Sequence, residues 1–330
     1  MDAHRIAHEA SRLLPLAERV LQRYPFEIKE VQHLVTHSNV MYRVVTEDGR
    51  QLVLRVGSPQ PNSRTNIKFE VAWLAALHRD TDLEVVHPVP TGYGGLIVEA
   101  QDPDPEVDAV RPCVLFSWVP GAPLGDGAGD FGYRLLGRMC ASLQQHGRTF
   151  KPADMDQMRQ WDRIFYYDKE LDPIIIEDTR YDHLFSRGRR NTIAQAGEIA
   201  THVLEETWKS GDPHVVHGDL HEWNAHVVAS RLYVFDFEDV MIATPAQDVS
   251  VCLYSSRATA RASAVQEAFQ RGFEDVAPWP IQSQRQLDGL HAARQNMLMN
   301  YAARTLPMGE AVAYLDHVMP WLSQYVDTYG

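Results

Sequence analysis

The feature that most constrains the fold is a change in hydrophobic periodicity partway along the chain. Before residue 120 the apolar segments are short and several alternate with a period of two, whereas after residue 130 apolar residues recur at helical spacing. A β-rich part followed by a longer helical part is typical of a two-lobed α+β protein. We therefore expect a small β-rich N-lobe over residues 1–116 and a larger, mostly helical C-lobe over residues 117–330.

The N-lobe is expected to hold an antiparallel sheet and one main helix after an N-terminal helix. Glu47-Asp48-Gly49-Arg50 separates two β-branched runs, and Asp-Gly at such a place is a strong hairpin signal. The main helix can be capped by Asn62 or Ser63, and Glu70 falls within its apolar stripe, where a buried carboxylate needs a partner. The expected helices cover 3–23 and 63–79, and the expected strands cover 28–35, 40–46, 51–56, 96–99 and 112–119.

The C-lobe pattern is helical with one β interruption. Helical spacing appears over 131–146, 190–210 and most of 246–329. The interruption consists of two apolar runs, 225–228 and 232–235, which indicate a hairpin. Thr244-Pro245-Ala246-Gln247 indicates a helix start, because it places an N-cap, a first-turn proline and a capping-box glutamine in order.

Charge and composition exclude several classes of protein. The formal net charge is -13, and the chain has no basic stripe, so we expect no nucleic-acid partner. No apolar stretch is long enough to cross a membrane, and the first residues lack the apolar core of a signal peptide. The three cysteines lie far apart in apolar segments, which favours buried thiols and a reducing cytoplasm.

Polar residues cluster in sequence around the predicted hairpin. Asn224 stands just before its first strand and Asp236 just after its second, so antiparallel pairing is expected to bring both to one end. Asp219 lies upstream on a loop. Carboxylate and amide oxygens are ligands that Mg²⁺ accepts, and phosphoryl transfer needs such ligands together with one uncommitted carboxylate as base. The pattern therefore predicts a phosphoryl-transfer site.

These residues also carry a family resemblance. His217-Gly-Asp219-Leu-His221-x-x-Asn224, followed by Phe235-Asp236-Phe-Glu-Asp239, resembles the aminoglycoside phosphotransferase and choline kinase superfamily, which has a protein-kinase-like fold. Pro245 and Asp248 match its Pro-x-x-Asp, and 116–121 resembles the hinge between lobes. The resemblance extends from about residue 28 to about residue 255. It departs from the family pattern at Arg55, where kinases carry lysine, and at Trp223, where the family usually carries glycine.

The resemblance implies a role for each matching residue. Asp219 is the base in the loop that His217 and His221 belong to, Asn224 and Asp236 bind Mg²⁺, and Asp248 supports that loop from inside. Arg55, paired with Glu70, touches the phosphates of ATP, with GTP left open as the donor. Ser38 and Asn39 in the first β-turn contact phosphate, and backbone groups near Ser117 and Val119 bind adenine.

The expected acceptor is a small molecule with a hydroxyl group, and the acidic balance favours a positive charge on it. Glu238 and Asp239 are candidate acceptor residues, and the acidic segment 168–182 adds carboxylates that could line the same cleft. The chain reaches the capped helix at Thr244 within eight residues of Asp236, which leaves no long activation segment of the kind that presents a peptide to protein kinases.

Three alternatives stay open at this stage. A protein Ser/Thr kinase uses the same scaffold. A pseudokinase would bind nucleotide without needing Asp219. A zinc hydrolase could use His217, Asp219 and His221, although no His-Glu-x-x-His motif is present. The sequence leaves the identity of the acceptor and the oligomeric state open.

Overall fold

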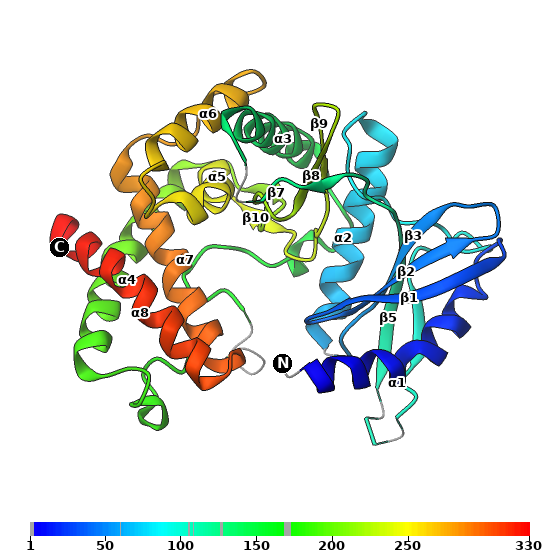
Figure 1. Ribbon diagram of the computed structural model, residues 1–330. Coiled ribbons are helices and arrows are strands. Elements are labelled where there is room, and N and C mark those ends of the chain that lie inside the picture. The colour runs from blue at the N-terminus through cyan, green and yellow to red at the C-terminus, as the bar shows by residue number, and fades with distance from the viewer. Residues whose placement is uncertain (1–2, 60, 105, 108, 126–127, 168–172) are drawn as a thin grey trace. The chain divides into compact units, whose positions relative to one another are not determined.

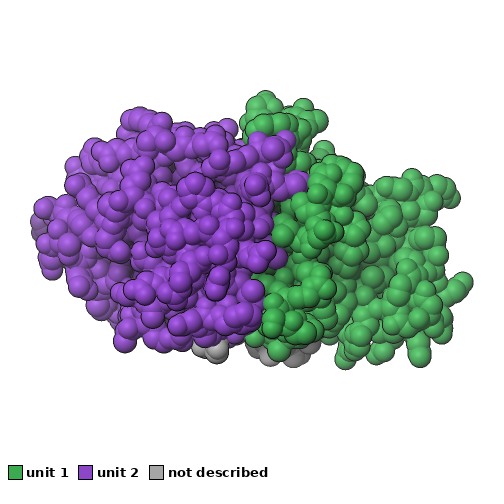
Figure 2. Space-filling model, turned by 90° about the horizontal axis from the view of Figure 1, so that it is seen from above, with its two compact units in different colours: residues 1–123, 150–158, 225–239 green, residues 124–149, 159–224, 240–330 purple. Residues whose placement is uncertain are grey.

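The computed structural model describes residues 3–59, 61–104, 106–107, 109–125, 128–167 and 173–330 of the chain (Figure 1). The chain divides into two compact units (Figure 2). Unit 1 contains residues 1–123, 150–158 and 225–239, and unit 2 contains 124–149, 159–224 and 240–330. Unit 1 thus runs past residue 116, where we expected the N-lobe to end, and it includes the predicted hairpin from much later in the chain.

Unit 1 is built on a five-stranded sheet in the order β1-β2-β3-β5-β4, with every neighbouring pair antiparallel. The β2–β3 connection is the expected Asp-Gly turn, in which Gly49 has a φ of 84°. Conformations with positive φ suit glycine because it has no Cβ. The strands are β1 (Ile28–Thr36), β2 (Val40–Thr46), β3 (Gln51–Val56), β4 (Val98–Gln101) and β5 (Val110–Ser117).

The two faces of this sheet have different neighbours. Helix α1 (Ala3–Leu21) packs on the face that carries Leu52, Leu54 and Val56, and the side chains between them form one buried apolar cluster. Helix α2 (Pro61–Asp80) contributes Glu70, which pairs with Arg55 of β3. Because successive residues of a strand point to opposite faces, the apolar residues of β3 and Arg55 were expected on opposite sides, and this alternation is confirmed.

The predicted hairpin is present in unit 1. Strands β8 (Ala225–Val228) and β9 (Arg231–Val234) pair with Ala225 opposite Val234, and the short β6 (Ala122–Pro123) pairs with β8. The turn residues Ala229 and Ser230 both have positive φ, as two-residue hairpin turns require.

Unit 2 is mostly helical, with one small sheet of β7 (His214–Val216) and β10 (Met241–Ala243). α3 and α6 pack with their backbones in close approach: a Cβ on Gly137 would lie 2.0 Å from the carbonyl oxygen of Phe269. A second buried cluster joins α4, α7 and α8. The described helices of unit 2 are α3 (Asp130–Thr149), α4 (Arg187–Ser210), α5 (Pro245–Leu253), α6 (Ala262–Glu274), α7 (Gln284–Thr305) and α8 (Met308–Tyr329), with 3₁₀ turns η2 (Thr179–Tyr181) and η3 (Tyr254–Ser256). A further 3₁₀ turn, η1 (Met155–Gln157), belongs to unit 1.

The predicted elements are confirmed to within a few residues, whereas β6, β7 and β10 were not predicted. Strands of two or three residues are too short to show a period of two. Among the described residues, no helix combines the length and apolar character needed to cross a membrane.

Candidate active site

The loop between β7 and β8 carries Asp219, and its backbone is held from below by Asp248. Gly218 has a φ of 81°, and its amide donates a hydrogen bond of 3.1 Å to Asp248 Oδ1. The other oxygen of Asp248 accepts from the Gln144 amide at 3.1 Å, and the side chain is only 1% exposed. Asp248 belongs to α5, whose predicted capping box between Thr244 and Gln247 is confirmed. A buried carboxylate with several donors fixes the loop rigidly.

Asp219 lies at the centre of a polar group within unit 2. Arg294 Nη2 is 2.5 Å from Asp219 Oδ1, His221 Nε2 is 3.4 Å from Oδ2, and the Asn224 amide donates to the Asp219 carbonyl at 2.9 Å. The hydrogen bond from His221 and the charge of Arg294 outweigh the opposing effect of burial and lower the pKa of Asp219 to about 2. The side chain keeps 24% exposure, so it is a carboxylate at neutral pH with one side open to solvent.

Arg294 was not predicted from the sequence. It lies on α7, 75 residues after Asp219, and its side chain is only 10% exposed. The available signal was the run of polar side chains on α7 that includes His291, Arg294 and Gln295, because polar residues that a helix buries need partners. Nothing in the sequence pattern identified Asp219 as the partner.

Asn224 and Asp236 were predicted as metal ligands, and each has features that fit. The Asn224 amide nitrogen is occupied by Asp219, and its amide oxygen accepts no hydrogen bond from a described residue. Asp236 has a φ of 65°, a left-handed conformation that is uncommon for residues other than glycine and that often occurs at functional sites. An amide oxygen and a carboxylate are each hard oxygen donors of the kind that Mg²⁺ takes.

The histidines that suggested zinc have other partners. His217 Nδ1 accepts from the Asp219 amide at 3.3 Å, and His221 Nδ1 accepts from the Trp223 amide at 3.2 Å. Within the described part of the chain, no three His, Cys, Asp or Glu side chains are grouped as a metal ion would require. The histidines shape the loop, and the zinc hydrolase gains no support.

The ion pair predicted between Arg55 and Glu70 is present in unit 1. Arg55 Nη1 lies 2.9 Å from Glu70 Oε1 and Nη2 lies 2.5 Å from Oε2, and the two residues are 3% and 2% exposed. Burial alone would lower the pKa of Arg55, but Glu70, Glu238 and Asp236 outweigh it and raise that pKa. Arg55 is therefore a permanent, buried cation beside several carboxylates.

Some polar groups of the first β-turn and of the predicted hinge already form hydrogen bonds within the protein. The Asn39 amide donates to Glu238 at 2.6 Å and accepts from the Ser58 amide at 3.0 Å, which leaves exposed Ser38 as the side chain able to reach a phosphate. The Ser117 amide donates to the His87 carbonyl at 2.9 Å. Ser117, one of the two predicted adenine contacts, is the last residue of β5. Val119, the other predicted contact, follows the end of that strand.

Several of the acidic residues predicted to bind the acceptor have partners within the protein. Glu238 is bonded to Asn39 in unit 1, beside the first β-turn, and Asp239 also has a partner. In the acidic segment, Asp178 pairs with Arg180 and Asp182 pairs with Arg190. Residues 168–172 of that segment lie outside the described residues. Trp223 is 50% exposed on the catalytic loop.

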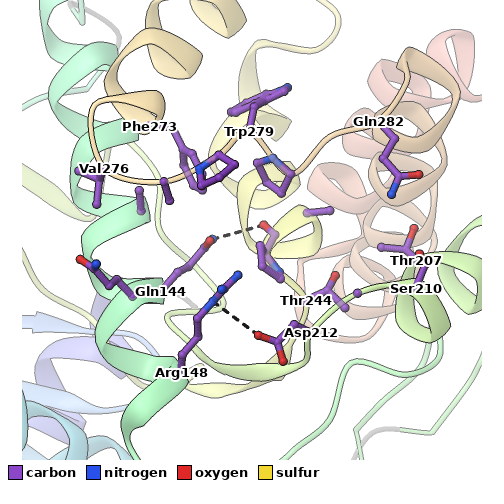
Figure 3. A pocket seen from close by; sticks show the side chains of 18 of the residues that line it. Gln144, Arg148, Thr207, Ser210, Asp212, Thr244, Phe273, Val276, Trp279 and Gln282 are labelled. Carbon is purple, nitrogen blue, oxygen red and sulfur yellow. Dashed lines mark hydrogen bonds and ion pairs between the residues drawn. The ribbon is translucent and has the colours of Figure 1, made fainter.

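A pocket of about 440 Å³ lies within unit 2 beside the start of α5 (Figure 3). Its lining residues include Thr244 and Gln144, and Figure 3 shows Trp279 and Phe273 across the pocket from Arg148 and Asp212. None of the described residues that line it belongs to the loop 217–224. The pocket is therefore separate from Asp219. Gln144 lines the pocket and also donates a hydrogen bond to Asp248.

Comparison with known proteins decides the family. Residues 30–282 match the model of the phosphotransferase enzyme family. The chain belongs to this family. The match covers most of the chain and includes the catalytic loop and both predicted metal ligands, so the resemblance to phosphotransferases seen in the sequence is confirmed.

Two relatives with similar sequences are distant. An uncharacterised protein of Synechocystis sp. is 26% identical over 246 residues, which cover 72% of this chain and 63% of that protein. Amicoumacin kinase of Bacillus subtilis is 24% identical over 259 residues, which cover 77% of this chain and 70% of that enzyme. The chain therefore matches less than two thirds of the length of the first of these relatives.

A solved structure shows the same fold. Amicoumacin kinase hAmiN, in complex with AMP-PNP, Ca²⁺ and Ami, superposes with a TM-score of 0.76 at 15% identity, covering 99% of this chain and 96% of that chain. The expected α+β, protein-kinase-like fold is thereby confirmed.

Proposed function

We propose that the protein is an ATP-dependent phosphotransferase that moves the γ-phosphoryl group to a hydroxyl of a small molecule. The observation that carries the proposal is the geometry of Asp219, an ionised carboxylate held by Arg294 and His221 with one side open to solvent. A carboxylate in this position can accept the hydroxyl proton and orient the oxygen for attack.

Further residues would bind the metal ion and the nucleotide. Asn224 and Asp236 are the residues that would hold Mg²⁺, which when bound neutralises charge on the phosphates of ATP. Arg55 keeps its charge through Glu70 and is suited to the α- and β-phosphates, because a guanidinium binds phosphate oxygens through several donors. Val119 and Ser38 are the proposed contacts to adenine and phosphate.

Two observations favour a small acceptor over a protein. The chain runs from Asp236 to the cap of α5 at Thr244 without a long activation segment. Two of the similar proteins are amicoumacin kinases, which act on a small molecule. A positive charge on the acceptor rests on the formal net charge of -13. The three described cysteines are free and buried, which supports a reducing cytoplasm.

The test is a screen for ADP release over hydroxyl compounds that include amino sugars, amino alcohols, sugars and hydroxy acids, with casein as a protein acceptor. The Asp219→Asn protein gives the blank, since it retains the nucleotide residues and lacks the base. Turnover above this blank with a small molecule supports the proposal. Robust phosphorylation of casein without turnover of any small molecule would contradict it.

A further inference from the structure

The pocket beside the start of α5 has no role in the proposed reaction, yet its size and its walls suit a ligand. Its volume of about 440 Å³ lies within the usual range for small-molecule sites. Its described lining residues all belong to unit 2. Figure 3 shows an aromatic wall, with Phe273 and Trp279, across the pocket from a charged wall, with Arg148 and Asp212. The pocket therefore offers a ligand an apolar surface and a charged surface that face each other.

Trp279 is held in place through its backbone and through its ring. The sequence Pro278-Trp279-Pro280 restricts the backbone, because a proline locks its own φ and limits the residue before it. The indole makes T-shaped contacts with Phe269, at 6.2 Å between ring centres, and with Phe273, at 5.6 Å. Trp279 nevertheless stays partly exposed and lines the pocket. An aromatic surface that is already ordered loses little conformational entropy when a planar ring packs on it.

Arg148 provides the opposite wall with hydrogen-bond donors that the protein leaves free. Its ion-pair partner is Asp212, whose Oδ2 lies 3.6 Å from Arg148 Nε, which is beyond hydrogen-bond distance. The Arg148 side chain is 52% exposed, so its N–H groups can reach a ligand in the pocket. A guanidinium presents these groups as a planar fork that matches a carboxylate or a phosphate. Asp212 is 69% exposed, and water and salt therefore screen much of its charge.

The lining residues between these two walls are fixed by close packing and hydrogen bonds. A Cβ on Gly211 would lie 2.6 Å from Thr244 Cγ2, so the turn after α4 is packed tightly against the start of α5. The Gln144 side chain donates to the Pro245 carbonyl at 3.3 Å and to Asp248 at 3.1 Å. The shape of the pocket is therefore set before a ligand binds, which lowers the entropy cost of binding.

We propose that this pocket binds a planar aromatic acid, with its ring on Trp279 and its carboxylate or phosphate on Arg148. The site is separate from that of the acceptor, because no described residue that lines the pocket belongs to the loop 217–224. It also stands independently of the proposed phosphotransferase activity, since it uses none of the residues assigned to the base, the metal ion or the nucleotide.

Isothermal titration calorimetry measures the binding without any turnover. The acidic probes are 2-naphthoate and 2-naphthyl phosphate, the neutral control is 2-naphthamide, and the non-planar control is decahydronaphthalene-2-carboxylate. We expect one saturable site for an acidic probe and at least tenfold weaker binding of both controls. Arg148→Gln and Trp279→Leu should each weaken binding of the acid at least tenfold. Arg138→Gln should leave it unchanged, because Arg138 is an exposed arginine of the same helix that does not line the pocket.

Each outcome supports or overturns the site. The acidic probe that binds assigns the acid as a carboxylate or a phosphate. No saturable binding of either acidic probe, or equal affinity in Arg148→Gln and Arg138→Gln, overturns the site. Equal affinity for 2-naphthamide or for the non-planar acid also overturns it, and this comparison stands even if Trp279→Leu does not fold.

Competition with nucleotide separates this site from the active site. Saturating AMP-PNP with Mg²⁺ should leave the affinity for the acidic probe unchanged, and displacement of the probe would overturn a separate site. The proposed function is judged independently by ADP release. Binding of the acid without turnover of any acceptor rejects the phosphotransferase proposal alone, whereas turnover without binding of the acid rejects the pocket alone.

Discussion

Arg294 and Asp219 lie 75 residues apart in the chain, yet Arg294 Nη2 is 2.5 Å from Asp219 Oδ1. The pair joins helix α7 to the catalytic loop and keeps the carboxylate ionised in a partly buried place. The proposed base therefore has a partner that lies outside the family motif.

Replacing the proposed base tests its chemical role. Asp219→Asn should lower kcat by about 10²–10⁴-fold, the usual worth of positioned acid–base catalysis, while ATP binding is retained. Asparagine still accepts a hydrogen bond from Arg294, so the loop should stay folded. Steady-state ADP release and ATP titration measure the two effects. Turnover close to that of the wild-type protein would remove Asp219 from the mechanism.

Removing the charge of Arg294 should change the pH dependence. The pKa of Asp219 is about 2 in the intact pair, so its protonation does not limit activity above pH 4. Arg294→Met removes the main positive charge that opposes the effect of burial on Asp219, so the pKa of Asp219 should rise. The acid limb of the kcat/KM profile should then move above the ordinary aspartate value of about 3.9. Arg294→Lys should restore most of the profile. An unchanged acid limb in Arg294→Met would mean that the pair is only structural.

Breaking this buried pair also costs stability. Arg294→Met leaves the carboxylate without its cation, and we expect a loss of about 3–5 kcal/mol in the free energy of unfolding. Urea denaturation at neutral pH measures it. The double variant Arg294→Met with Asp219→Asn should recover part of this loss, and failure to recover any would assign the effect to packing around the arginine.

The metal ligands can be tested by nucleotide-dependent stabilisation. Asp236→Ala should abolish the rise in Tm that ATP produces only when Mg²⁺ is present, because Mg²⁺ is shared between protein oxygens and substrate phosphates. Asp48→Ala, an exposed carboxylate in the β2–β3 turn of the same unit, is the control. Equal Mg²⁺-dependent shifts in both variants would rule Asp236 out as a ligand.

The Arg55–Glu70 pair allows structure and function to be separated. Arg55→Met alone leaves Glu70 buried and unpaired, so stability should fall by about 3–5 kcal/mol. Arg55→Met with Glu70→Met replaces both charges by apolar groups and should restore much of that stability. ATP affinity should stay low in both variants, because neither has a cation for the phosphates. Wild-type ATP affinity in the stable double variant would contradict the phosphate role of Arg55.

Local sequence patterns were enough to predict much of the secondary structure. The sequence by itself determined the strands with clear alternation, the Asp-Gly turn, the capped start of α5 and the hairpin that separates Asn224 from Asp236, because each depends on neighbours in the chain. The need of Glu70 for a partner was predictable, because a carboxylate in an apolar stripe requires one. Its pairing with Arg55 was predicted through the family resemblance. The family resemblance then predicted Asp219 as the base and Asp248 as its support.

Only the tertiary structure decided which distant side chain pairs with Asp219. Arg294 lies on helix α7, whose polar residues could face several neighbours, and periodicity does not specify which. Its partner follows from how α7 packs against the loop 217–224, which is a property of the whole unit. The charge beside Asp219 is therefore set by long-range packing, whereas the loop itself follows a local sequence motif.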